Sequence, residues 1–203
     1  MGTMSETKRI IVGISGASGV AYGVRALEML HALQIETHLV VTKAAEMTLA
    51  YEMGLSLPDM DKFVHTRYQL PDVGAAISSG SFRTMGMLIA PCSVRTMSEV
   101  ATGMTSTLLT RAADVVLKER RRLVLMVRET PLHLGHLRTM TALSEMGAII
   151  APPMPAFYAE PKSVDEIVTQ SVARVLDLFG LDAPDAKRWG EDLAKGRRGK
   201  PRT

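Results

Sequence analysis

The chain has 203 residues, which is long enough for one domain with a substantial core, and 46% of them are hydrophobic while only 4% are aromatic. Its formal net charge is +3, but five basic residues lie in the last nine positions, and the remainder balances 19 basic against 21 acidic residues, or −2. These numbers exclude a basic nucleic-acid-binding body, and the single cysteine excludes an internal disulfide framework.

Hydrophobic periodicity predicts alternating strands and helices. Arg9 to Ile14 is typical of a buried strand, and it leads through a glycine-rich turn into a helix that begins at Val20. Further strands are expected at 37–42, 86–90, 123–127 and 148–151, and further helices at 43–53, 94–100, 105–120, 134–146 and from the cap Ser163 to 178. Repeated strand–helix units of this kind predict an α/β fold, a three-layer, doubly wound and mostly parallel sheet.

The remaining segments predict turns and a tail. Residues 54–81 contain several prolines and glycines, so we expect a long excursion within the domain, and Pro91-Cys-Ser93 is expected to be a turn. Glu166, three residues after Ser163, predicts a capping box. We expect one domain over residues 1–189 and a disordered basic tail over 190–203. Because no apolar run approaches the roughly 20 residues that span a bilayer, we also expect a cytoplasmic protein without a membrane segment.

Two turns have the composition of phosphate-binding sites. Gly13-Ile-Ser-Gly-Ala-Ser-Gly19 joins a strand to a helix, where backbone N–H groups and the helix dipole favour an anion. The alternative is a tight turn without a ligand, although such a turn does not need the hydroxyls of Ser15 and Ser18. Pro91-Cys-Ser-Val-Arg-Thr96 repeats this arrangement at a later strand end. Together the two turns indicate a ligand with a phosphate and a polar ring system.

The second strand ends in Thr42-Lys43, without the acid that a dinucleotide-binding fold uses to hold a ribose. Cys92 could be a nucleophile, but no histidine or acid is tied to it by a local signature, so a buried structural thiol is favoured. His133 and His136 have i, i+3 spacing that could suit a metal, but without a nearby acidic ligand they are interpreted as histidines at a helix start.

Cationic side chains are concentrated in and after the region of residues 111–131. On a helix, Arg111, Asp114 and Lys118 share one face, and Arg128-Glu129 follows a buried strand, where ligands bind in open α/β sheets. These cations, together with Arg174, predict a phosphate site. The alternative is a salt-bridged surface, because Asp114 and Asp177 lie one helical turn from Arg111 and Arg174.

Taken together, these motifs resemble the flavin prenyltransferase family of the UbiX type, including its phenolic-acid-decarboxylase-associated branch, from about Lys8 to Trp189. The motifs that carry the resemblance are Gly13-x-Ser-Gly-Ala-Ser-Gly19, Thr42-Lys-Ala-Ala45, Ser78-Ser-Gly-Ser81, Pro91-Cys-Ser93, Arg111-Ala-Ala-Asp-Val-x-Leu-Lys-Glu119, Arg128-Glu-Thr-Pro131, Pro153-x-Pro-x-Phe-Tyr158, Val172-Ala-Arg174 and Arg188-Trp189. Such enzymes join a dimethylallyl group from dimethylallyl phosphate to N5 and C6 of reduced FMN without a metal. The resemblance also implies a homododecamer whose sites lie where subunits meet, and delivery of prenylated FMN to a UbiD-type decarboxylase.

The resemblance implies a role for each matching residue. FMN is expected to be held by Gly16, Ala17, Ser18, Thr42, Ser93, Val94, Arg95, Thr96, Arg111 and Arg128. The prenyl phosphate is expected to be held by Lys118, Arg128, Tyr158 and Arg174. Glu129 is the expected acid/base group and Trp189 offers a π face to the allyl cation, while Lys118, Ser18 and Glu52 complete the catalytic set.

Two other functions fit parts of the sequence. An FMN-dependent cysteine decarboxylase has a Pro-Ala-Ser-Ala-Asn-type turn, which differs from the Pro91-Cys-Ser-Val-Arg95 found here. A non-catalytic FMN carrier does not need the constellation of Lys118, Arg128, Tyr158 and Arg174. The sequence therefore favours the transferase.

Overall fold

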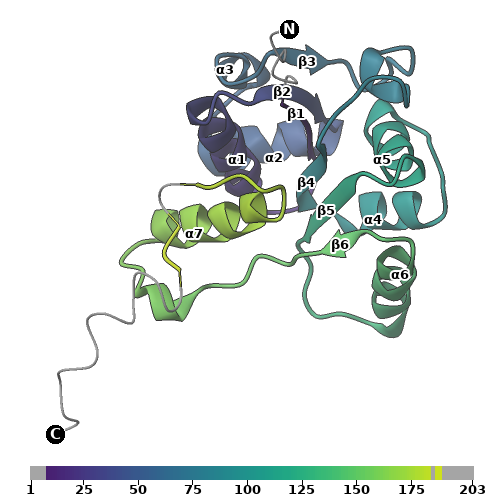
Figure 1. Cartoon of the computed structure of the whole chain (residues 1–203). Coiled ribbons are helices and arrows are strands. Elements are labelled where there is room, and N and C mark those ends of the chain that lie inside the picture. The colour runs from purple at the N-terminus through teal and green to yellow at the C-terminus, as the bar shows by residue number, and fades with distance from the viewer. Residues whose placement is uncertain (1–7, 184–185, 189–203) are drawn as a thin grey trace, which may run out of the picture.

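A computed structural model describes residues 8–183 and 186–188 of the chain (Figure 1). Trp189 and the tail predicted over residues 190–203 lie outside the described residues. The prediction for the tail and the catalytic role expected for Trp189 are therefore not tested by the structure.

The centre of the protein is a six-stranded sheet in the order β3-β2-β1-β4-β5-β6, in which every neighbouring pair is parallel (Figure 1). Its strands are β1 (Arg9–Ile14), β2 (Glu36–Val41), β3 (Thr66–Tyr68), β4 (Gly86–Cys92), β5 (Arg122–Val127) and β6 (Ile149–Ile150). The strand order reverses between β1 and β4, so the carboxyl ends of these two strands form the crevice in which open α/β sheets bind ligands.

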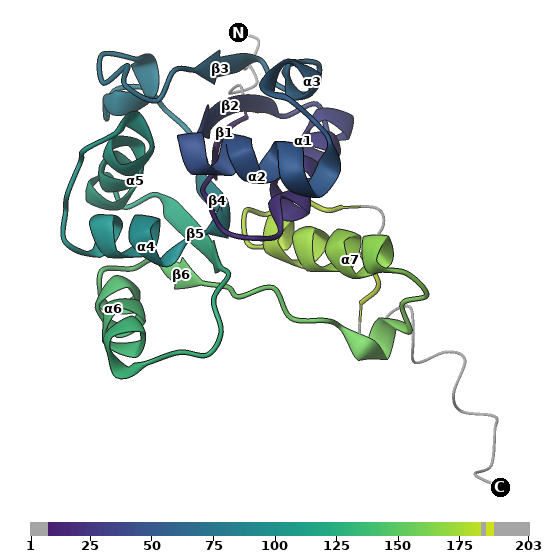
Figure 2. The same cartoon turned by 180° about the vertical axis from the view of Figure 1, so that it is seen from behind.

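Helices cover both faces of the sheet. One face carries α1 (Val20–Ala32), α2 (Lys43–Met53), α3 (Leu57–Asp61) and α7 (Val164–Asp177), and the other carries α4 (Val94–Ala101), α5 (Leu108–Lys118) and α6 (Leu134–Glu145). The view from behind shows α2 beside α1, with α4, α5 and α6 across the sheet from them (Figure 2). The predicted three-layer, doubly wound α/β fold is confirmed.

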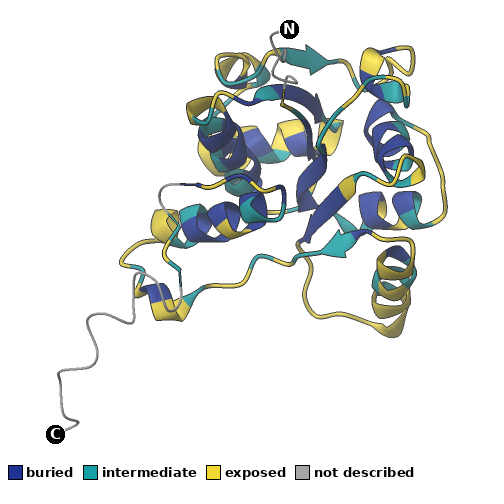
Figure 3. Cartoon of the chain, in the orientation of Figure 1, coloured by how far each residue is buried: buried dark blue, intermediate teal, exposed yellow. Residues whose placement is uncertain are grey.

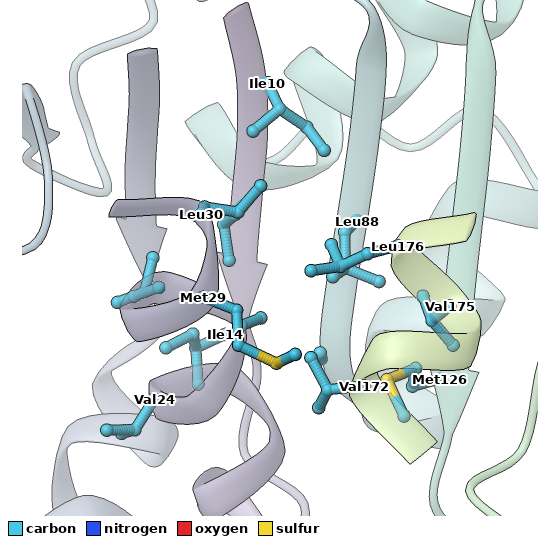
Figure 4. Packing of buried hydrophobic residues seen from close by; sticks show 14 of the residues in the cluster. Ile10, Ile14, Val24, Met29, Leu30, Leu88, Met126, Val172, Val175 and Leu176 are labelled. Carbon is cyan, nitrogen blue, oxygen red and sulfur yellow. The ribbon is translucent and has the colours of Figure 1, made fainter. Parts of the chain in front are cut away.

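Aliphatic side chains fill both layers between helices and sheet. In Figure 3 the strands β1, β2, β4 and β5 are mostly buried, β3 and β6 are intermediate, and α6 is largely exposed. Figure 4 shows α1 and α7 placing Leu30 and Leu176 over Ile14 of β1 and Leu88 of β4. Each such buried side chain contributes roughly 1.5–3 kcal/mol relative to an exposed one. This packing holds α7 against α1 and over β4 and β5.

Residues 54–81, expected as a long excursion within the domain, have secondary structure of their own. The segment contains α3, the edge strand β3 and the 3-10 helix η1 (Ala76–Ser78). Ser56 caps α3, and Pro58 lies in its first turn, where a proline interrupts no intrahelical hydrogen bond. Strand β3 is only three residues long and pairs on one side alone, which is too little for a periodic signal in the sequence.

Two further expectations change in detail. Strand β4 continues to Cys92 instead of turning at Pro91, because a register shift between Ile89 and Cys92 lets the ladder resume beyond the proline. At the start of α7 the Ser163 hydroxyl does accept from the N–H of Glu166. The Glu166 carboxylate, however, accepts from the N–H of Lys162 at 2.9 Å, so the predicted capping box is shifted by one residue.

Candidate active site at the carboxyl ends of the strands

The ends of β1 and β4 are joined by one buried hydroxyl group. Ser15 is fully buried; its Oγ donates to the Pro91 carbonyl at 2.9 Å and accepts from the Ser93 N–H at 2.8 Å. This hydroxyl therefore both donates and accepts a hydrogen bond within the protein. Of the two serines that favoured a ligand in the glycine turn, Ser15 holds the two turns together, whereas Ser18 is exposed.

The second turn opens α4 with an arrangement suited to an anion. Ser93 is the N-cap residue, and its Oγ accepts from the N–H of Thr96 at 3.3 Å. Val94 and Arg95 are the first two residues of the helix, so their N–H groups have no partner within it. Hydroxyl groups and helix N–H groups therefore converge at the positive end of the α4 dipole.

A cavity of about 300 Å³ lies at this point. Its lining includes six of the residues that the resemblance assigns to FMN, namely Gly16, Thr42, Ser93, Val94, Arg95 and Thr96. The other lining residues, which sequence reasoning missed, are Lys43, Ala44, Leu70, Glu99, Thr107, Leu109 and Thr110. Thr42 and Thr107 are N-cap residues of α2 and α5, so three helices begin at this cavity. The N-cap residue types at the starts of α2, α4 and α5 were the signal that could have found this part of the lining.

Glycine is required at position 16 by its close neighbour. A Cβ atom there would overlap the Cβ of Ala44, in the first turn of α2. This close approach brings the glycine-rich turn and the start of α2 to the same side of the cavity. Ala17 and Ser18 follow Gly16 and are partly or fully exposed.

The start of α1 is capped by a carboxylate from α2. Glu52 Oε2 accepts from the N–H of Gly19 at 2.9 Å and from the N–H of Val20 at 3.1 Å. An internal anion thus occupies the position at which the glycine-rich turn suggested a phosphate. The N-terminus of α4, not that of α1, is the one that opens into the cavity.

Arg128 and Glu129 lie exposed just beyond the carboxyl end of β5. The N–H of Arg128 donates to the Cys92 carbonyl at 3.0 Å, and Glu129 Oε1 accepts from the N–H of Thr130 at 3.0 Å. Burial raises the pKa of Tyr22 on α1, and the positive charge of Arg128 opposes that rise. The guanidinium therefore acts electrostatically at the start of α1, next to the glycine-rich turn.

Tyr158 and Arg174 are brought together from distant segments. Tyr158 belongs to the 3-10 helix η2 (Phe157–Ala159) and Arg174 to α7, and both line two adjoining cavities of about 250 Å³ and 320 Å³. The smaller cavity is mainly apolar, with walls that include Met126, Pro153 and Val175. A ligand with an apolar tail and an anionic head fits a cavity of this kind.

Lys118 and Arg111 lie elsewhere in the same chain. Lys118 ends α5, before β5 begins, whereas Arg128 follows β5, so about 20 Å of strand separates the two positions. The Lys118 ammonium pairs with Glu119 at 2.5 Å. Arg111 pairs with Asp114 at 2.8 Å and donates to the Ser78 carbonyl at 3.3 Å. One chain alone therefore does not bring Lys118 to Arg128, whereas Arg111 lies near the start of α5, with its side chain held by Asp114 and Ser78.

The remaining candidates have structural contacts. Cys92 is fully buried, and burial raises the pKa of its thiol to about 12, so the reactive thiolate is suppressed near neutral pH. His133 caps α6 by accepting from the N–H of Gly135 at 3.0 Å, and its ring stacks on that of His136. Within residues 8–183 and 186–188 there is no group of three or more His, Cys, Asp or Glu side chains that could hold a metal. Nor does any described helix have the length and apolar character needed to cross a membrane.

Comparison with known proteins identifies the family. Residues 1–176 match the family model described as Flavoprotein. The chain is 54% identical over 193 residues to the flavin prenyltransferase UbiX of Thauera aromatica, which covers 93% of this chain and 100% of the relative. It belongs to the UbiX-type flavin prenyltransferases.

Solved structures of family members have the same fold. AnUbiX (PadA1), crystallised with FMN and dimethylallyl pyrophosphate, superposes with a TM-score of 0.89 at 44% identity and covers 91% of this chain and 98% of its own. A dodecameric FMN-dependent UbiX-like decarboxylase from Escherichia coli O157:H7 gives a TM-score of 0.87 at 49% identity and covers 89% and 98%. The resemblance noted in the sequence is thus confirmed.

The donor set at the cavity beside the start of α4 fits a flavin mononucleotide. Thr42, Ser93 and Thr96 supply hydroxyl groups, and the α4 terminus supplies N–H groups, all of which can donate to a phosphate dianion. In the turn at residues 16–18 the Ala17 N–H donates to the Ser15 carbonyl at 2.8 Å, and the exposed Gly16 and Ser18 can offer their peptide groups to the polar edge of an isoalloxazine ring.

Proposed function

We propose that this protein is a flavin prenyltransferase that moves a dimethylallyl group from dimethylallyl phosphate to N5 and C6 of reduced FMN. One observation carries the proposal. The same edge of the sheet holds an anion-binding cavity at the start of α4 and an apolar cavity that ends at Tyr158 and Arg174. A flavin phosphate and a prenyl phosphate require these two kinds of site.

In this proposal the α4 terminus and the hydroxyls of Thr42, Ser93 and Thr96 hold the FMN phosphate. The turn at residues 16–18 and Arg128 face the ring system. When bound, reduced FMN supplies the nucleophilic N5 and C6 atoms. The chain's own residues orient the flavin and keep its reacting edge toward the prenyl donor.

Arg174 and Tyr158 hold the donor phosphate. The allylic C–O bond would break and its electron pair would leave with the phosphate, so negative charge would grow on the phosphate oxygens while the freed carbon bonds to N5, which gives up its proton. The remaining prenyl double bond would then take up a proton at its middle carbon, and C6 would bond to the tertiary carbon so formed and release its own proton. Cationic and hydroxyl donors that bind these oxygens more strongly as the charge grows lower the barrier. Glu129 takes up the proton that C6 releases on ring closure, and an apolar pocket protects the allylic cation from water.

Lys118 completes the donor site from a neighbouring subunit. This assignment is supported by the length of β5, which separates Lys118 from Arg128 within one chain. It is also supported by the dodecameric assembly of the E. coli relative. Arg111 lies on the same helix, α5, and we assign it to a site shared between subunits on the support of that dodecameric assembly alone.

The product is proposed to serve a UbiD-type decarboxylase in the cytoplasm. According to the family resemblance, prenylated FMN is used by such decarboxylases. The buried, reduced Cys92 suits a reducing compartment.

The deciding experiment is anaerobic incubation of the protein with reduced FMN and dimethylallyl phosphate, followed by mass analysis of the released flavin. We expect a flavin heavier by one dimethylallyl unit, and release of inorganic phosphate in equal amount. A carrier would bind FMN and return it unchanged. A cysteine decarboxylase would leave FMN unmodified and act instead on a peptide with a carboxyl-terminal cysteine.

A further inference from the structure

A short segment after α7 folds back over the cavity that contains Tyr158 and Arg174. This segment, residues 186–188, is here called the strap. Gln170 of α7 binds its backbone twice: Nε2 donates to the Lys187 carbonyl at 2.8 Å, and Oε1 accepts from the Lys187 N–H at 3.0 Å. Gln170 is 6% exposed, so this paired amide contact is shielded from water.

The strap also contacts η2, on the other side of the cavity. Lys187 Nζ donates to the carbonyl of Ala159 at 3.0 Å, and Ala159 follows Tyr158 directly. The strap therefore bridges the two elements that supply Tyr158 and Arg174. Any shift of the strap changes the distance between those elements.

Asp177 connects the strap to Arg174. Its two carboxylate oxygens accept from Arg188 at 2.7 Å and 2.9 Å, and Oδ2 lies 3.6 Å from the guanidinium of Arg174. Asp177 is the last residue of α7, where the helix dipole disfavours a negative charge. The two arginines compensate that charge, and the side chain of Asp177 is only 15% exposed.

The same residues line one cavity. Its wall consists of Tyr158, Gln170, Arg174, Asp177, Ala186, Lys187 and Arg188. The residues assigned to the donor phosphate and the residues that fasten the strap are therefore neighbours around one space of about 320 Å³. The strap is also the segment that immediately precedes Trp189 in the sequence.

We propose that Gln170 and Asp177 are positioning residues for the prenyl-phosphate site: they fasten the strap so that Tyr158 and Arg174 are held at the spacing that binds the donor phosphate. This inference rests on the proposed function of the site. Neither residue needs to touch the donor. Coupling between two sites is reciprocal. If the fastened strap strengthens donor binding, then donor binding also stabilises the fastened strap.

Asp177→Asn tests this positioning role, with Asp165→Asn as its matched control. Both aspartates lie on α7 and pair with an arginine from another segment, Asp177 with Arg188 and Asp165 with Arg25. We expect Asp177→Asn to raise KM for dimethylallyl phosphate about tenfold, since a charge-assisted contact of this kind is lost, while the Kd for FMN changes less than about twofold. Asp165→Asn should leave both constants unchanged.

A second pair of variants covers the case in which Asp177→Asn does not fold. Arg188→Gln removes the strap's side of the contact, and Arg188→Lys keeps its charge. We expect the glutamine variant to reproduce the raised KM and the lysine variant to recover part of the loss. An unchanged KM in both Asp177→Asn and Arg188→Gln would overturn the proposal. A lowered KM in Asp177→Asn would also overturn it, because the carboxylate would then compete with the donor for Arg174.

Hydrogen exchange on the unmodified protein gives an independent test. With FMN bound, addition of dimethylallyl phosphate should slow exchange of the Lys187 amide, which donates to Gln170. If the exchange rate of the Lys187 amide does not change when the donor is added, the strap has only a structural role. If the unmodified protein forms no prenylated flavin at all, the proposed function fails; if it forms product but the strap variants keep the parent KM, only the present inference fails.

Discussion

The carboxylate of Glu52 accepts hydrogen bonds from the backbone N–H of Gly19 at 2.9 Å and 3.2 Å, so the end of α2 caps the start of α1. Gly19 has a φ of 96°, a left-handed conformation that a glycine adopts without strain. This contact fixes the turn at residues 16–18 from its far end. Glu52 thereby acts on the candidate flavin site through the backbone.

Replacing Glu52 by alanine should destabilise the protein by about 0.5–2 kcal/mol, the usual range for loss of a helix cap. Glu52→Gln keeps an acceptor oxygen and should retain most of that stability. Chemical denaturation of the two variants measures the difference. If Glu52 is also catalytic, as the resemblance implies, the glutamine variant will keep this stability but will be slower than the parent in prenyl transfer.

Ser15→Ala should cost about 1–3 kcal/mol, because it leaves the buried N–H of Ser93 and one acceptor site of Pro91 without their partner. For a domain of this size that corresponds to a fall in Tm of roughly 2–4 °C per kcal/mol. The loss should also weaken FMN binding, since Ser93 begins the α4 anion site. Ser18→Ala, at an exposed hydroxyl, is the control and should leave Tm unchanged.

The strands and helices were predictable because most of them are long and periodic. Predicted and observed bounds of α2 coincide at residues 43–53, and β1 runs from Arg9 to Ile14 as expected. An apolar run marked β1 in the sequence, and the structure adds that Thr42 is the N-cap of α2. Strand β3 escaped prediction because its three residues are partly exposed and paired on one side only.

The candidate site was predictable only where its residues follow strand ends. Ser93 and Thr42 stand at such ends, so topology alone brings them to one edge of the sheet. Gln170 was missed because its partner is the backbone of Lys187, seventeen residues away, and backbone partners leave no trace in the sequence. Lys118 was placed with Arg174 by resemblance, yet the predicted order, a helix over 105–120 before a strand over 123–127, already puts Lys118 and Arg128 at opposite ends of that strand.

Acid should destabilise the protein through His38. Burial lowers the pKa of His38 below its usual range, although its hydrogen bond with Glu36 opposes the shift. The unfolded chain, in which a histidine has a pKa near 6.5, therefore binds more protons than the folded protein as the pH falls toward and below that value. The free energy of unfolding should decrease as the pH falls through this window and be constant above it.

His38→Gln removes the titrating group but can keep a hydrogen bond to Glu36. Its free energy of unfolding, measured by denaturation between about pH 5 and pH 8, should depend less on pH than that of the parent. His31→Gln changes an exposed histidine and should preserve the parent profile. An identical slope in His38→Gln and the parent would assign the acid sensitivity to other groups.

Glu129→Gln should lower kcat for prenyl transfer about a hundredfold or more, the range expected for loss of a general acid or base. The exposed carboxylate accepts a hydrogen bond from the N–H of Thr130, a contact that glutamine can keep. KM for dimethylallyl phosphate and Kd for FMN should therefore change little. Glu145→Gln, at the exposed end of α6, is the matched control. A parent-like kcat in Glu129→Gln would remove this residue from the chemistry.

Lys118 and Arg128 lie at opposite ends of β5, so they can serve one ligand only if they come from different subunits. Lys118→Ala and Arg128→Ala should each be inactive as a pure oligomer. The two variants are then dissociated, mixed in equal amounts and reassembled. In each site the subunit that supplies position 118 has an even chance of carrying the parent lysine, and the subunit that supplies position 128 has an even chance of carrying the parent arginine. About a quarter of the sites should then be complete, and prenyl transfer should return to about a quarter of the parent activity.

Mixing without subunit exchange is the control and should restore nothing. A reassembled mixture that stays inactive, although mass analysis shows mixed oligomers, would mean that both cations act within one chain or on different ligands.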